Sequence, residues 1–193
     1  MRDRLLLITA VAALTLGAAG FAVAANETDD ADQADAAQAT EPISEDAALA
    51  TFAGGCFWCT EAAFEKTEGV YEAISGFTGG TVEDPTYEQV VTGTTGHAEA
   101  AQIWYDPAVI SYDELLTIYW RTIDPTDADG QRFDRGPQYR TAIFYHDDEQ
   151  RELALASRAA LDESGRFDVP VVTEIQEAVT FYPAEEYHQD FYL

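Results

Sequence analysis

Two cysteines, Cys56 and Cys59, stand in the stretch GGCFWCTEAAFEK at residues 54–66, and the chain has no others. From Cys56 to Lys66 apolar side chains recur at helical spacing, which predicts a helix that begins at Cys56. A cysteine at a helix start lies near unpaired backbone N–H groups and the positive end of the helix dipole, and both favour thiolate over thiol. Helical residues i and i+3 lie about 5 Å apart between Cα atoms, so the pair can also form a disulfide.

Two other uses of the cysteine pair fit the sequence less well. A chain of 193 residues with 47% hydrophobic content can form a core without a staple, and so short a disulfide loop adds little stability. A metal site would need more ligands, and the three histidines show no metal-binding spacing. The segment at 125–130 matches part of a calcium loop, but Pro125 and Gly136 stand where its first and last ligands belong. We therefore predict a redox pair with no metal and no organic cofactor.

The cysteine pair is accompanied by further motifs along the chain. They are GCFW (55–58), GFTGG (76–80), PTYEQV (85–90), TGHAEA (95–100), DRGPQYR (134–140) and FYPAEEYHQDF (181–191). In this order they resemble the peptide methionine sulfoxide reductases of the A type. The resemblance extends from Ala53 to the C-terminus, and it is specific because several separate motifs agree in sequence and in spacing.

The resemblance implies roles for individual side chains. Cys56 would be the nucleophile, and Glu99 the acid that protonates the sulfoxide oxygen. Phe57 and Trp58 would form an apolar wall for the substrate methyl group. The remaining implied substrate-binding residues, on the oxygen side of the pocket, are Tyr87, Asp134 and Tyr139.

The chemistry of the residues agrees with these roles. Attack on a sulfoxide sulfur expels no good leaving group unless its oxygen is protonated, so the reaction needs a thiolate, a neutral carboxylic acid and phenol donors together. Strand alternation puts Glu99 on the same face as Ala101 and Ile103. Burial on that face would raise the pKa of the Glu99 carboxyl, so that it keeps its proton near neutral pH.

Cys59 gains importance from a departure from the family pattern. Many relatives keep resolving cysteines near the C-terminus, and this chain has none there. Cys59 is then the internal thiol that can condense with a sulfenic acid on Cys56. The alternative is that Cys59 is a structural helix residue and that an external donor attacks the sulfenic acid directly.

The expected activity is reduction of methionine S-sulfoxide, in proteins or free, to methionine, with a thioredoxin-like dithiol protein as reductant. One alternative is a general CxxC thiol-disulfide oxidoreductase, and another, of a different class, is an acidic exported binding module. The net charge of −26 argues against nucleic acid as a partner, because phosphates would repel such a surface. We expect a monomer.

The N-terminal region has the composition of a targeting segment. Residues 1–25 carry two arginines, then an apolar run, then small residues, which is typical of a secretory signal peptide. Residues 26–46 carry eight acidic and no basic side chains, which predicts a disordered tether. The protein would then be periplasmic or extracellular, or tethered to a membrane if the apolar run is not cleaved.

The elements that must position the motifs lie in residues 47–193, which we interpret as one domain. Strands are predicted at 69–80, 98–106 and 140–145, with one or two more within 170–182. A capping box at Ser111 predicts a helix there, and Asp147 predicts another that ends at Gly165. Because strands and helices do not alternate strictly, the order predicts an α+β fold, a single two-layer domain with a mixed sheet and flanking helices.

Overall fold

The computed structural model describes residues 43–44 and 46–192. The predicted signal peptide and most of the predicted tether lie outside these residues. The helices are α1 (Phe57–Glu65), α2 (Tyr87–Val90), α3 (Tyr112–Thr122) and α4 (Asp148–Glu163), with short 3-10 turns at Pro137–Tyr139 and Glu186–His188. The strands are β1 (Ala48–Gly54), β2 (Val70–Thr78), β3 (Ala98–Tyr105), β4 (Gly130–Gln131), β5 (Asp134–Arg135), β6 (Thr141–Tyr145), β7 (Glu174–Glu177) and β8 (Tyr182–Pro183).

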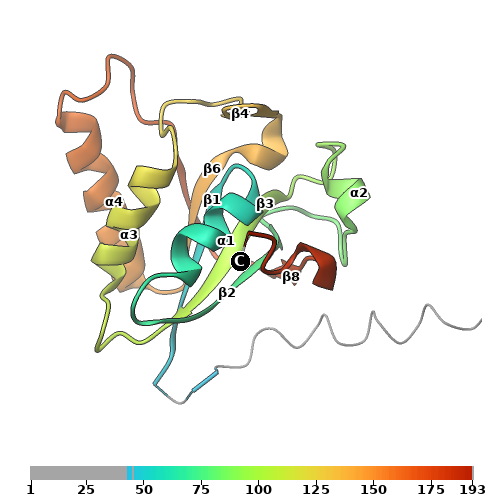
Figure 1. Cartoon of the computed structure of the whole chain (residues 1–193). Coiled ribbons are helices and arrows are strands. Elements are labelled where there is room, and N and C mark those ends of the chain that lie inside the picture. The colour runs from blue at the N-terminus through green and yellow to red at the C-terminus, as the bar shows by residue number, and fades with distance from the viewer. Residues whose placement is uncertain (1–42, 45, 193) are drawn as a thin grey trace, which may run out of the picture.

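Six of the strands form one sheet in the order β7-β6-β1-β3-β2-β8 (Figure 1). The β6–β7 pair is parallel and every other pair in this sheet is antiparallel, so the sheet is mixed, as predicted. The strands β4 and β5 form a separate small hairpin. The sequence did not predict β1, which pairs with β3 and β6 near the centre of the sheet.

The main core lies between one face of the sheet and the helices α1, α3 and α4. Phe64 of α1, Tyr119 of α3 and Ala154 of α4 belong to the same buried cluster as Phe52 and Ile103 from the sheet. A smaller cluster of β1, β3 and β6 side chains packs with Phe181. All eight residues of β3 are buried, so any polar side chain on this strand is withdrawn from water.

Helix ends follow local signals in the sequence. The capping box at Ser111 and Glu114 begins α3, and the Asp147 side chain accepts the Gln150 backbone N–H at the start of α4. Both predicted helices are therefore confirmed. The helix α1 begins one residue later than predicted, because Cys56 is its N-cap. Within residues 43–44 and 46–192, none of the helices is long and apolar enough to cross a membrane.

Candidate active site

The turn that presents Cys56 joins the central strand β1 to α1 and depends on glycine. Gly55 has φ +88°, and a Cβ atom there would lie 2.6 Å from the Gln131 side chain. The Cys56 carbonyl accepts the backbone N–H groups of Cys59 and Thr60, at 3.1 and 3.2 Å, which starts the helix. The Cys56 side chain thereby lies just beyond the end of the central strand β1, where it is half-buried.

The electrostatics at Cys56 differ from the sequence-based expectation. Burial raises the pKa of the Cys56 thiol to about 12, and the Glu99 carboxylate adds to this increase. The backbone N–H groups of Cys59 and Trp58 act in the opposite direction, as expected for a helix start, but they do not outweigh burial. Cys56 at rest is therefore a thiol, and protonation of Glu99 removes only the part of the increase that comes from its charge.

Glu99 lies in the buried strand β3, with 1% of its surface exposed. Its Oε2 accepts the Phe57 backbone N–H at 3.0 Å, which ties the carboxyl to the residue beside Cys56. Burial raises the pKa of Glu99 to about 7, the Phe57 N–H lowers it, and the charge of Asp134 raises it further. A carboxyl with this pKa holds a proton on about half of the molecules at neutral pH and can donate it.

Two tyrosines, Tyr87 and Tyr139, lie within electrostatic range of this carboxyl. Burial raises the pKa of Tyr139 to about 12 and also raises the pKa of Tyr87, and the charges of Glu99, Cys56 and Asp134 add to both shifts. All three groups are therefore within electrostatic range of both phenols. The phenols stay protonated over the physiological range and are available as hydrogen-bond donors. The predicted polar side chains are thus brought together, although they come from α2, β3, β5 and a 3-10 turn.

The two predicted wall residues occupy different environments. The Phe57 ring is 1% exposed and packs within an aromatic cluster, with centroids 5.7 Å from Phe77 and 6.1 Å from Tyr87. Trp58 is half-buried, and its ring stacks on Phe191 with centroids 3.9 Å apart and an interplanar angle of 8°. Trp58 is therefore the more accessible of the two rings, and the Phe57 ring lies 5.8 Å from it between centroids.

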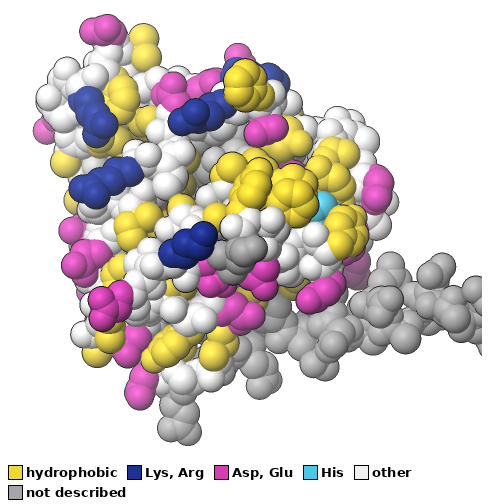
Figure 2. All heavy atoms as spheres, viewed as in Figure 1, with side chains coloured by type: hydrophobic (Ala, Val, Ile, Leu, Met, Phe, Trp, Pro, Cys, Tyr) yellow, Lys and Arg dark blue, Asp and Glu magenta, His cyan; other side chains and the backbone are white. Residues whose placement is uncertain are grey.

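The sequence analysis did not assign Phe191, Tyr192 or His188 to the site. The His188 ring lies 5.1 Å from the Phe57 ring and 5.5 Å from the Trp58 ring, between centroids. Tyr192 meets Trp58 edge-on at 6.4 Å, and the charges of Cys59 and Cys56 raise its pKa. The motif that ends at Phe191 was visible, but nothing local indicates that this end of the chain folds back over α1. In Figure 2 hydrophobic side chains gather on this face, with a histidine among them.

Cys59 lies one helical turn beyond Cys56 and is exposed, and both cysteines are free thiols. The charge of Cys59 contributes to the raised pKa of Cys56, so the two sulfurs are near one another.

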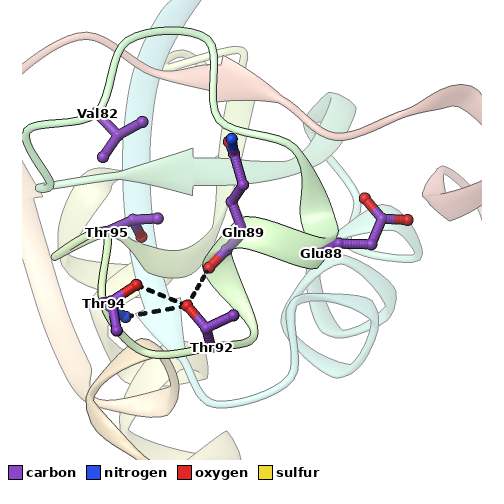
Figure 3. Close-up of a pocket in the computed structure, with 6 residues that line it drawn as sticks. All are labelled: Val82, Glu88, Gln89, Thr92, Thr94 and Thr95. Carbon is purple, nitrogen blue, oxygen red and sulfur yellow. Dashed lines mark hydrogen bonds between the residues drawn. The ribbon is translucent and has the colours of Figure 1, made fainter.

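A separate hollow of about 360 Å³ lies beside α2, lined by Val82, Glu88, Gln89, Thr92, Thr94 and Thr95 (Figure 3). It contains none of the predicted site residues. Its threonine hydroxyls bond within the loop, with Thr92 donating to the Gln89 carbonyl at 2.7 Å.

No group of three or more His, Cys, Asp or Glu side chains that could hold a metal ion occurs in the part of the chain that the structure describes. The side chains described above provide the chemical groups of the site. They are a thiol, a neighbouring carboxyl that shares a proton with solvent near neutral pH, phenol donors and an aromatic surface.

Comparison with known proteins identifies close relatives. The sequence profile of the family described as peptide methionine sulfoxide reductase matches residues 48–193. The chain is 60% identical over 148 residues to the peptide methionine sulfoxide reductase MsrA of Listeria monocytogenes, covering 77% of this chain and 84% of that protein.

Among solved structures, reduced Mxr1 from Saccharomyces cerevisiae superposes with a TM-score of 0.71 at 32% identity, covering 78% of this chain and 87% of Mxr1. Mxr1 has also been solved in complex with Trx2. That structure matches with a TM-score of 0.54 at 27% identity, over 77% of this chain and 88% of that one.

Proposed function

The chain belongs to the peptide methionine sulfoxide reductase family, and from that membership we propose that it is a peptide-methionine (S)-S-oxide reductase acting through Cys56. The observation that carries the assignment of residues is the bond from the Phe57 N–H to Glu99 Oε2 at 3.0 Å. It holds a buried carboxyl of pKa about 7 beside the candidate nucleophile, which is what protonation of a sulfoxide oxygen requires.

In the first half-reaction the Cys56 thiol loses its proton to solvent and its sulfur attacks the sulfoxide sulfur, while Glu99 gives a proton to the oxygen and afterwards takes one back from solvent. Tyr87 and Tyr139 donate hydrogen bonds to the same oxygen, and Asp134 closes the polar side of the pocket. The oxygen passes to Cys56, which becomes a sulfenic acid, and the thioether departs as methionine. The substrate sulfur gains two electrons and the cysteine sulfur loses two, so no metal or organic cofactor takes part. The methyl group lies against Trp58, supported by Phe57.

In the second half-reaction Cys59 attacks the Cys56 sulfenic acid, releases water and forms the Cys56–Cys59 disulfide. The i to i+3 spacing and the exposure of Cys59 support this assignment. A thioredoxin-like dithiol protein then reduces the disulfide by exchange, which the solved complex of yeast Mxr1 with Trx2 supports.

The Cys59 assignment is tested by reaction with excess sulfoxide in the absence of reductant, followed by thiol counting and peptide mass mapping. Loss of both thiols is expected in the wild type, with a sulfenic acid trapped only in Cys59→Ser. A wild-type protein that keeps one free thiol beside a stable sulfenic acid would rule out resolution by Cys59.

The activity itself is tested with the two sulfoxide epimers of a blocked methionine and dithiothreitol as reductant. Consumption of the S epimer and not of the R epimer is expected. Reduction of insulin disulfides without any consumption of sulfoxide would instead indicate a general oxidoreductase. A response of stability to divalent ions, with both epimers untouched, would indicate a binding module.

The proposal extends to location and assembly. Residues 1–25 act as a secretory signal and residues 26–46 as an acidic tether, so the domain works outside the cytoplasm, in the periplasm or beyond the cell. The same proposal takes the domain to be a monomer. The support is the pattern of charges and apolar residues in the sequence. Cell fractionation with mass measurement of the mature N-terminus, and light scattering of the purified protein, test these points. A mature protein that starts at Met1 and stays in the membrane would indicate an uncleaved anchor.

A further inference from the structure

The C-terminal segment Gln189–Tyr192 lies beside α1 and is tied to β2 by a side chain instead of a strand ladder. Figure 1 shows the C-terminal end in front of the sheet, next to α1. The Gln189 Oε1 accepts the Ser75 backbone N–H at 2.9 Å, and its Nε2 donates to the carbonyls of Ser75 and Ala184 at 3.0 and 2.8 Å. The Ser75 carbonyl also accepts the Ala184 backbone N–H at 2.9 Å, so the Gln189 amide extends the attachment of the C-terminal region to β2 beyond its pairing with β8.

Glu61 provides the second attachment of this segment. It lies on α1, the helix that carries Trp58 and Cys59, and only 2% of its surface is exposed. Its Oε1 accepts the Asp190 backbone N–H at 2.5 Å, and its Oε2 accepts the Ser75 hydroxyl. Within the described part of the chain, no basic side chain is among the groups that act on this carboxyl. Burying a carboxyl without a cation is costly unless it is hydrogen-bonded. Both oxygens of Glu61 accept hydrogen bonds, one from β2 and one from the end of the chain.

The Asp190 attachment determines where the last aromatic residues lie. Asp190 has φ +57°, in the left-handed region, so the chain turns sharply after its N–H has been bound. The next residue, Phe191, stacks on Trp58, and Tyr192 follows with its ring edge-on to Trp58. Phe191 and Tyr192 remain 51% and 54% exposed. Their placement therefore depends on the turn before them and on the stack itself.

We propose that Glu61 is a positioning residue: by holding the Asp190 N–H it fixes the C-terminal segment, which then completes the aromatic side of the substrate site at Trp58. The inference rests on the proposed function, because it assigns the aromatic surface to the substrate methyl group. Glu61 does not touch substrate. It acts through Asp190, Phe191 and Tyr192 on how well the sulfoxide is bound.

A merely structural Glu61 would act within α1 and β2 whether or not the segment is present, so a double-mutant cycle separates the two roles. The four proteins are the wild type, Glu61→Ala, a chain that ends at Gln189, and the combination. Single-turnover rates over a range of blocked methionine S-sulfoxide concentrations give the half-saturating concentration and the limiting rate.

We expect Glu61→Ala and the shortened chain each to raise the half-saturating concentration, by up to about tenfold for a lost aromatic stack, with little change in limiting rate. The combined protein should be no worse than the shortened chain alone. Glu61→Gln keeps an oxygen acceptor for the Asp190 N–H and should bind like the wild type. Effects of the two changes that add, or a shortened chain that binds like the wild type, would overturn the proposal.

Two controls keep the test decisive. If Glu61→Ala does not melt cooperatively, Glu61→Leu replaces it, because a leucine fills the volume and leaves no buried charge. Alkylation of Cys56 by iodoacetamide needs no sulfoxide, so it reports on access to the site independently of turnover. The alkylation rate should increase to the same extent in Glu61→Ala and in the shortened chain. The combined protein should show no further increase. A wild type that reduces no sulfoxide refutes the proposed function. Unchanged or additive alkylation rates refute the role of Glu61.

Discussion

The polar and the aromatic sides of the site are held in place by different kinds of structure. Glu99 lies in a strand paired on both edges, and its carboxyl is bonded to the backbone of α1. Asp134 belongs to a hairpin that the Arg135–Asp127 ion pair joins to the preceding turn. The stack of Trp58 on Phe191, in contrast, depends on a chain end that two side chains attach.

This difference matches what each side must do. Proton transfer and attack at sulfur require heavy atoms to lie within a few tenths of an ångström of the productive geometry, and backbone pairing provides that rigidity. Recognition of a methyl group by aromatic surface is less directional and tolerates a looser support. Changes on the polar side should therefore alter the rate of the chemical step, and changes on the aromatic side should alter binding and selectivity.

The largest effect is expected at the nucleophile. Cys56→Ser should leave no first-turnover methionine, because a serine hydroxyl is a far weaker nucleophile than a thiol, and a carboxylate of pKa about 7 is too weak a base to ionise it. The measurement is product formed from excess enzyme without reductant, and a melting curve shows that the fold persists. Product above a trace from a folded serine variant would show that the nucleophile is elsewhere.

On the polar side, Glu99→Gln removes the proton donor and keeps the shape of the side chain. The first-turnover rate should fall by roughly 10²–10⁴-fold, the contribution of a positioned general acid. The wild-type rate should also show a break near pH 7, at the pKa of Glu99, which the glutamine variant lacks. Stopped-flow rates that match the wild type across this range would make Glu99 a structural residue.

The same carboxyl predicts a pH dependence of stability. The pKa of Glu99 is raised from its ordinary 4.5 to about 7 in the folded protein, so the folded state holds the proton more tightly than the unfolded state. Its contribution is complete below pH 4.5 and is lost as pH rises to 7, a decline of about 3 kcal/mol in the free energy of unfolding. Urea titrations at both pH values measure the free energy of unfolding. From pH 4.5 to pH 7 the stability of Glu99→Gln relative to the wild type should rise by this amount. The relative stability of Glu152→Gln, at an exposed position of α4, should not change.

The sequence predicted the locally determined elements and missed those that depend on distant partners. The helices α3 and α4 carry their caps within four residues, at Ser111 and Asp147, and were correctly predicted. The strand β1 was missed, because its short apolar run becomes a central strand only by pairing with β3 and β6. The helix α2 was also missed, although its capping box of Thr86 and Gln89 is local and could have been found.

The candidate site shows the same division. The motifs identified Cys56 and Glu99 as candidates. Strand alternation predicted the burial of Glu99, which the structure confirms. The raised pKa of Cys56 could not be anticipated, because burial by the folded chain outweighs the local effect of the helix start. Glu61 gave no signal at all: its partners Ser75 and Asp190 are 14 and 129 residues away in the sequence.

The smallest effect is expected on the aromatic side, at Trp58. Trp58→Ala removes the indole ring that stacks on Phe191 and forms the proposed methyl-binding surface. The limiting rate of the chemical step should change little. Selectivity between a methyl sulfoxide and its ethyl or propyl analogue should fall by about tenfold, since a pocket discriminates one methylene by about 1–3 kcal/mol.

Trp120→Ala is the matched control, because it removes an equally large half-buried ring on α3, where the indole N–H donates a hydrogen bond to the Ser157 hydroxyl at 2.7 Å. Competition between paired sulfoxides in one tube measures the ratio of kcat/KM directly. An equal loss for every substrate in Trp58→Ala, of the kind the Trp120 control produces, would mean that Trp58 supports the fold and does not select the methyl group.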